Sequence, residues 1–212
     1  MLGMATLGLL AALALPSDPP IADVIVTMLG SQGLVVASRF ARSLRESGSR
    51  ATLVMIFVDS AATRRVAHAL AEWHVTPFFV NASAPPYRTM RGARDKLVRY
   101  WAAERYLTMR AAIHAGGRVL LADSRDLLFQ RDPFTIEADP TRPLDIFLED
   151  YLRNFRNSGI NMGHVVPCFG EEAVRRLLLL PAPRPVSCSG VTMGSYAAVL
   201  RYLRAMWDDR TK

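Results

Sequence analysis

One stretch decides how this chain folds: Arg118-Val119-Leu120-Leu121-Ala122-Asp123-Ser124-Arg125-Asp126. Its apolar part, residues 119–122, has the composition of a buried strand in a parallel sheet. Two carboxylates, Asp123 and Asp126, follow where that strand would end, and open α/β sheets bind ligands at the carboxyl ends of their strands. Carboxylate oxygens held close together suit a divalent cation that also grips phosphates. The alternative is that Asp126 and Asp132 are acids of a loop or helix start, paired with Arg125 and Arg131.

Strand-like and helix-like segments alternate on both sides of this stretch. Apolar runs rich in branched residues predict strands at residues 22–28, 53–58, 76–80, 119–122 and 144–148. Helical spacing of apolar residues predicts helices at residues 34–46, 63–73, 95–114, 171–180 and 194–207. Such alternation is typical of α/β proteins, in which helices flank a mostly parallel sheet. We therefore expect a Rossmann-like α/β domain over residues 21–212.

The bulk composition supports one domain and excludes several classes of function. At 212 residues, half of them hydrophobic, the chain can bury a substantial core. The net charge is +7, but the sequence contains no RNP, zinc-finger or basic-zipper pattern, so we expect no nucleic acid partner. The chain has no GxGxxG after its first strand and no Walker A or GxSxG motif. Their absence argues against a dinucleotide oxidoreductase and a P-loop NTPase.

The N-terminus predicts targeting to the secretory pathway. Residues 1–16 are apolar and uncharged, and Ala12-Leu13-Ala14 resembles a small-residue cleavage site. The run is short for a transmembrane helix and has no basic segment before it, so a wrongly assigned start is the alternative. We expect residues 1–20 to be a targeting segment and linker, with membrane association through it and a final location in the Golgi lumen or outside the cell.

Two further features bear on that location. Cys168 and Cys188 would be free to pair in an oxidising lumen, and two buried thiols are the alternative. The triplet Asn81-Ala82-Ser83 is an N-glycosylation sequon.

The central stretch resembles the metal-site segment of GT-A glycosyltransferases, nucleotide-diphospho-sugar transferases in which a strand ends in Asp-x-Asp or a variant. Residues 119–134, VLLADSRDLLFQRDPF, are similar to a eukaryotic group that reads D-x-R-D-x-x-F-Q-x-D-P-F. Residues 188–195, CSGVTMGS, are similar to a CSG-x-x-x-G segment of the same group. Asp123 and Asp126 have two residues between them rather than one, which leaves open which acids touch the metal. The likeness runs from about Asp23 to the C-terminus.

The resemblance implies a GT-A-like fold and the transfer of a sugar from a nucleotide-sugar donor to a hydroxyl of a glycan or glycoprotein. A divalent ion, Mn²⁺ or Mg²⁺, would bridge Asp123 and Asp126 to the diphosphate and act as a Lewis acid. Other residues are expected to contact the donor or the sugar, or to brace the metal loop: Asp59, Lys96, Arg99, Arg125, Ser189 and Gly190. Ordinary strand-end, helix-surface and turn roles are the alternatives for these residues.

Three segments near the metal motif have roles that stay open. Glu149 and Asp150 follow the strand at 144–148 and are candidates for the base that an inverting transferase needs, whereas a retaining one needs no such base there. The glycine-containing segment 157–163 is expected to be a ligand-binding loop, with a plain turn as the alternative. Asp132, directly before Pro133, is predicted to form a turn.

Two rival functions stay open at this point. GT-A enzymes commonly place a late histidine or acid on the metal, beyond a helix like that at 194–207, and only a few residues follow it here. The domain would then be C-terminally incomplete or inactive and would retain only nucleotide binding. The second rival is a basic nucleic-acid-binding module, for which the net charge is the only support.

Overall fold

The computed structural model describes residues 22–29, 33–81, 83, 95–139, 141–148, 154, 157, 159–180 and 187–208. The strands are β1 (Val24–Leu29), β2 (Thr52–Val58), β3 (Val75–Val80), β4 (Arg118–Ala122), β5 (Leu144–Leu148) and β6 (Ser187–Ser195). The α-helices are α1 (Leu34–Glu46), α2 (Ala61–Ala69), α3 (Asp95–Met109), α4 (Ala111–His114), α5 (Gly159–Leu179) and α6 (Tyr196–Asp208). Short 3-10 turns are η1 (Ala71–Trp73) and η3 (Pro133–Thr135).

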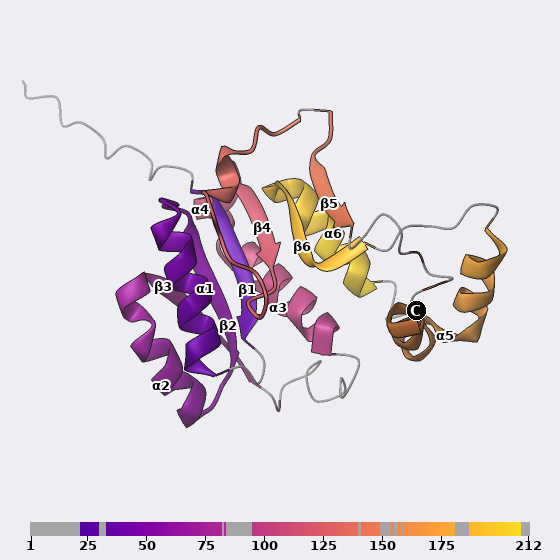
Figure 1. Cartoon of the computed structure of the whole chain (residues 1–212), viewed down its shortest axis with the longest axis horizontal. Coiled ribbons are helices and arrows are strands. Elements are labelled where there is room, and N and C mark those ends of the chain that lie inside the picture. The colour runs from indigo at the N-terminus through magenta and orange to yellow at the C-terminus, as the bar shows by residue number, and fades with distance from the viewer. Residues whose placement is uncertain are drawn as a thin grey trace, which may run out of the picture.

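The strands form one six-stranded sheet in the order β3-β2-β1-β4-β6-β5. Strands β1 to β4 pair in parallel, and β6 runs antiparallel between β4 and β5. Helices α1 and α2 cover one face of the sheet, and α3 and α6 cover the other (Figure 1). The structure therefore confirms the predicted α/β fold with a mostly parallel sheet flanked by helices.

Two apolar cores lie on the two faces of the sheet, as the alternation of side chains along a strand requires. In β1, Val24 and Val26 pack toward α3 and α6, whereas Ile25 and Leu29 pack toward α1 and α2. All four side chains are buried. The central parallel strands are thus mostly apolar on both faces, which explains why their sequences are nearly continuous hydrophobic runs, interrupted in β1 by the buried Thr27.

The edge strands differ from the central ones. β3 pairs only with β2 and carries Pro77, a residue that sheets tolerate at their edges because it has no N–H to donate. Among the described residues β5 pairs with β6 alone, and its Ile146 and Phe147 are exposed.

Several predicted elements were wrong in extent or kind. The expected helix at 63–73 is α2 followed by η1, separated at Leu70, and the expected helix at 95–114 breaks at Arg110 into α3 and α4. The loop expected at 157–163 is wrong from Gly159 onward, because α5 begins there and continues through a kink at Gly170, where φ is +79°.

The largest error is β6, since residues 187–195 had no predicted strand and the last helix was expected from residue 194. The strand exists because its backbone pairs with two neighbours: Thr192 stands opposite Leu121 of β4 and Ile146 of β5. Gly194 is a tight point in this pairing. A β-carbon there would lie 2.5 Å from the Pro143 carbonyl oxygen.

Parts of the sequence interpretation lie outside the described residues. These parts are residues 1–20 with their targeting role, Ala82 of the sequon, Glu149 and Asp150, and the side chains of Cys168 and Cys188. Asn81 itself is exposed. Within the described part of the chain, no helix has both the length and the apolar character needed to cross a bilayer.

Replacing Gly194 by alanine should destabilise the sheet. The added methyl group would clash with backbone atoms of Pro143 and Leu144, so β5 must shift away from β6. We expect Gly194→Ala to lower the free energy of unfolding by about 1–3 kcal/mol in urea denaturation, the usual cost of overpacking. Gly159→Ala is the control, because a methyl group added there would meet no other segment of the chain within 4 Å. Equal stability of the two variants would contradict this account of β6.

Candidate functional site

The candidate site lies where the parallel strands end. Asp123 directly follows β4, and Asp59 directly follows β2, with β1 between these two strands. Because β1, β2 and β4 are parallel, both acids lie at the same edge of the sheet. In open α/β sheets this carboxyl edge is where ligands bind.

Asp123 is held by contacts on three sides. Its backbone N–H donates to the carbonyl oxygen of Gly190 on β6 at 2.7 Å. Its Oδ1 accepts the backbone N–H of Arg125 at 3.3 Å, and its Oδ2 lies 3.6 Å from Nη1 of Arg99 on α3. The carboxylate is 40% exposed, so it faces solvent while its orientation is fixed. The fold thus gathers four predicted site residues, Asp123, Arg99, Arg125 and Gly190, in one place.

Asp126 lies three residues further on, in the turn after β4. It is exposed and, within the described part of the chain, makes no ion pair. Ser124 anchors the turn, since it is fully buried and its hydroxyl donates to the Met28 carbonyl oxygen of β1 at 3.5 Å. The turn therefore presents two solvent-accessible acids, of which Asp123 contacts Arg99 and Asp126 makes no ion pair among the described residues.

Helix α1 holds the segment that follows β4 through two hydrogen bonds and one contact between aromatic rings. Arg39 donates from its guanidinium to the Arg125 carbonyl oxygen at 2.6 Å. One turn further along α1, the Ser43 hydroxyl accepts the Phe129 backbone N–H at 3.2 Å, and the Phe40 and Phe129 rings meet edge to face at 5.1 Å. Both hydrogen bonds join residues 86 positions apart in the sequence, so no local pattern predicted them.

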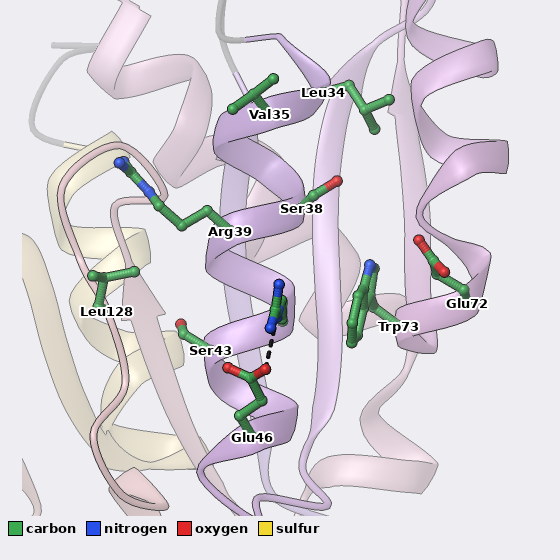
Figure 2. Close-up of a pocket in the computed structure, with 10 residues that line it drawn as sticks. Leu34, Val35, Ser38, Arg39, Ser43, Glu46, Glu72, Trp73 and Leu128 are labelled. Carbon is green, nitrogen blue, oxygen red and sulfur yellow. Dashed lines mark hydrogen bonds and ion pairs between the residues drawn. The ribbon is translucent and has the colours of Figure 1, made fainter.

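Helix α1 and Leu128, from the segment that α1 holds, line an open groove (Figure 2). Figure 2 shows Arg39 reaching from α1 toward the segment that carries Leu128. The groove has a cavity volume of about 670 Å³, and its rim includes the exposed side chains of Leu34, Val35 and Leu128. Local sequence patterns do not predict this surface, because its residues come from three separate segments of the chain.

Behind Asp123, two tyrosines join α3 to α6. The rings of Tyr100 and Tyr202 meet edge to face at 5.9 Å, and buried Thr192 of β6 lies beside the Tyr202 side chain. Burial first, and the neighbouring Tyr100 second, raise the pKa of Tyr202 well above its ordinary value. The Arg99 guanidinium lies 5.3 Å from the centre of the Tyr100 ring. This buried polar cluster therefore fixes the part of α3 that carries Arg99.

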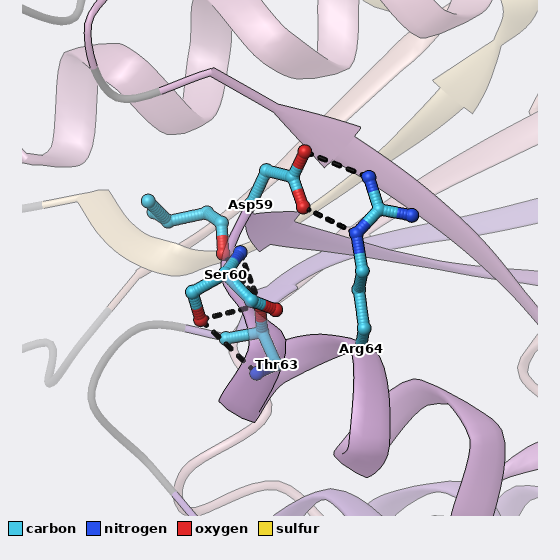
Figure 3. Close-up of polar contacts among 5 residues, drawn as sticks. Asp59, Ser60, Thr63 and Arg64 are labelled. Atoms are coloured by element: carbon cyan, nitrogen blue, oxygen red, sulfur yellow. Dashed lines mark hydrogen bonds and ion pairs between the residues drawn. The ribbon is translucent and has the colours of Figure 1, made fainter.

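Asp59 has a different environment from Asp123 (Figure 3). Arg64 of α2 donates to both of its carboxylate oxygens at 2.8 Å, and both side chains are exposed. The hydrogen bond with Asp59 raises the pKa of Arg64. A capping box between Ser60 and Thr63 starts the helix directly after Asp59. Asp59 thus has a local partner, and its contact with a ribose or base stays a prediction.

The remaining predicted residues fall into two groups. Lys96 belongs to α3 and Ser189 to β6, but their side chains lie outside the described part, as do Glu149 and Asp150 entirely. Asp132 is confirmed as a turn former. It begins η3, and its carboxylate accepts the Phe134 backbone N–H at 3.1 Å.

The chemistry of Asp123 and Asp126 fits a hard divalent cation. Among the described residues no three His, Cys, Asp or Glu side chains gather into a metal cluster. Two carboxylates leave further coordination positions for water and for oxygens of a phosphorylated ligand, which is how Mg²⁺ is usually held. The donor set thus suits a cation that binds together with a phosphate group.

Comparisons with known proteins agree with the fold. No family model matches the chain, and no curated protein sequence does. The apo structure of the bifunctional glycosyltransferase WbbM matches 91% of this chain with a TM-score of 0.50 and 11% identity. The chain spans 35% of that protein. At this identity the match shows a shared α/β fold.

Two structures of the galactosyltransferase LgtC are also similar to this chain. One is a complex with donor and acceptor sugar analogues, and the other is an active-site mutant. Each matches 89% of this chain and 66% of LgtC, with a TM-score of 0.45 and identities of 13% and 14%.

Removing the Tyr202 hydroxyl should expose the role of the tyrosine cluster. Tyr202→Phe removes the hydroxyl that lies among Tyr100 and Thr192, and we expect a loss of about 1 kcal/mol in the free energy of unfolding near pH 8. The folded-state pKa is raised above the ordinary 10.0, so the stabilisation from Tyr202 is fully present below pH 10 and is lost progressively above it, where the tyrosine ionises in the unfolded chain before it does in the folded one. Urea denaturation of both proteins from pH 8 to 11 measures this. A stability difference that does not shrink with pH would contradict it.

Proposed function

We propose that this chain is a divalent-cation-dependent glycosyltransferase that moves a sugar from a nucleotide-diphosphate donor to an acceptor hydroxyl. The observation that carries the proposal is the environment of Asp123, at the carboxyl end of β4. Its carboxylate is oriented by Arg99 and by the Arg125 N–H while it remains partly exposed, and Asp126 follows on the same turn. The fold shared with WbbM supports the same class of reaction.

Electrostatics explain why a cation is needed. A nucleotide diphosphate is strongly anionic and is repelled by two bare carboxylates. Asp123 and Asp126 would hold a divalent cation, whose two positive charges would offset those of the carboxylates and remove the repulsion of the diphosphate. When bound, the cation supplies Lewis-acid stabilisation to the departing phosphate. The Arg99 guanidinium adds a positive charge beside the same carboxylate and suits phosphate oxygens.

The other parts of the proposal concern the acceptor and the cellular location. We propose a glycan or glycoprotein hydroxyl as acceptor, with Glu149 and Asp150 as candidate bases if the reaction inverts the anomeric centre. We also propose that residues 1–20 direct the domain into the secretory pathway. Mn²⁺ or Mg²⁺ is the proposed metal, since both accept all-oxygen ligands.

Charge removal at the two acids tests the metal site. We expect Asp123→Asn and Asp126→Asn each to weaken Mn²⁺-dependent binding of UDP or GDP by more than about 100-fold, beyond the loss usual for outer-shell residues. Asp126→Asn should change the stability by less than about 0.5 kcal/mol, because Asp126 is exposed and makes no ion pair among the described residues, whereas Asp123→Asn also removes the ion pair with Arg99. Calorimetric titration of nucleotide with and without Mn²⁺ measures the effect.

A third acid provides the control for these variants. Asp139 lies near Arg118, the first residue of β4, and so at the opposite edge of the sheet from Asp123. Asp139→Asn should leave metal-dependent nucleotide binding unchanged. The proposed metal site is wrong if both Asp123→Asn and Asp126→Asn bind the nucleotide in an Mn²⁺-dependent way with wild-type affinity.

Helix α1 should contribute to the site through Arg39. Arg39→Met removes the hydrogen bond to the Arg125 carbonyl oxygen and loosens the turn that presents Asp126. We expect roughly three- to tenfold weaker binding of Mn²⁺ with UDP, the size of effect that one charged hydrogen bond allows. Arg42→Met is a matched control on the same helix, since Arg42 pairs only locally with Glu46 at 2.6 Å. Equal nucleotide affinities of the two variants would refute a positioning role for Arg39.

A further inference from the structure

The strongest unexplained feature of the site is that Asp123 already faces a positive charge. Nη1 of Arg99 lies 3.6 Å from Oδ2 of Asp123, while Oδ1 of the same carboxylate accepts the Arg125 N–H. The Arg99 side chain is only 16% exposed, and it extends from a helix fixed by the Tyr100–Tyr202 contact. The guanidinium is therefore placed beside Oδ2, the carboxylate oxygen that accepts no backbone hydrogen bond among the described residues.

A free divalent cation meets an unfavourable field at this position. To reach Oδ2 it must approach within a few ångströms of the guanidinium, and like charges so close repel strongly where water is partly excluded. A cation that arrives with a nucleotide diphosphate brings net negative charge instead. The phosphate oxygens can then accept hydrogen bonds from the guanidinium as it leaves the carboxylate.

We infer that Arg99 competes with metal for Asp123, so that the site rejects free divalent cations and accepts a cation only together with a nucleotide diphosphate. The inference rests on the proposed function, and it adds an order to the binding events. Nη1 and Oδ2 are separated by more than a normal hydrogen-bond length, so this contact is electrostatic and can be exchanged. Arg99 would thus contact the carboxylate before the nucleotide binds and the diphosphate afterwards.

The inference predicts opposite effects of one substitution on two binding reactions. We expect Arg99→Met to bind Mn²⁺ alone roughly three- to tenfold more tightly than the wild-type protein, because the competing charge is gone. The same variant should bind UDP or GDP in the presence of saturating Mn²⁺ several-fold more weakly than wild type, since a phosphate contact is lost. A purely structural role for Arg99 would weaken both reactions.

Calorimetric titrations of Mn²⁺ alone, and of UDP and GDP at saturating Mn²⁺, measure both quantities on the full chain. Arg99→Lys keeps the positive charge and should keep the weak affinity for free Mn²⁺. Arg204→Met is the matched control, because Arg204 pairs with Glu104 of the same helix α3 at 3.2 Å and contacts neither acid of the site. It should match wild type in both titrations.

The outcomes separate this inference from the proposed function. If Arg99→Met and wild type bind free Mn²⁺ equally, or if Arg99→Lys behaves like Arg99→Met, the competition is refuted. The proposed function survives that result as long as Asp123→Asn still loses Mn²⁺-dependent nucleotide binding. If Asp123→Asn retains that binding, Asp123 is not a metal ligand and both ideas fail.

Discussion

The pairing of β4 with β6 is the interaction on which the rest of the site depends. Without β6, β4 would be an edge strand, and the acids that follow it would lie at the margin of the sheet. The antiparallel ladder instead makes β4 a central strand, and the 2.7 Å hydrogen bond from Asp123 to Gly190 extends the ladder one residue beyond it. The same strand brings α6 back across the sheet, where Tyr202 meets Tyr100 of α3. The position of Arg99 therefore follows from β6 as much as from α3.

Two aspartates at one sheet edge show how differently the chain holds its charges. Asp59 is paired with Arg64, five residues later, through two hydrogen bonds that form as α2 forms. Asp123 is paired across the fold with Arg99, so that contact exists only after α3 has docked on the sheet. A local pair of this kind fixes a turn, whereas a pair between distant segments can change partners without disturbing either element. Asp123 is therefore the better candidate of the two for exchanging its arginine partner for a bound ligand.

The sequence predicted the parts of the fold that local patterns control. The mostly apolar runs of β1, β2 and β4 identified buried parallel strands, and the acid after β4 identified the end of the sheet where the candidate site lies. β6 was not predicted, because its sequence, SCSGVTMGS, is dominated by small and polar residues. Its strand conformation depends on pairing with β4 and β5 on either side. The long helix expected at 95–114 failed for a related reason, since nothing in its spacing marks the break at Arg110.

The site likewise contains residues that local sequence predicts and residues that only tertiary packing brings in. Asp123 and Asp126 could be placed from their spacing after a strand, and the resemblance to a known family suggested Arg99. Arg39, Ser43, Tyr202 and Thr192 could not be foreseen, because each acts through a partner that only tertiary packing supplies.

The two edges of the described sheet differ in their capacity to accept another strand. On β3, Pro77 removes a backbone donor, so this edge is a poor template for a further chain and protects against edge-to-edge aggregation. β5 has no proline, and its outer residues Ile146 and Phe147 are 45% and 40% exposed. Within the described sheet, a further strand would therefore meet more hindrance at β3 than at β5.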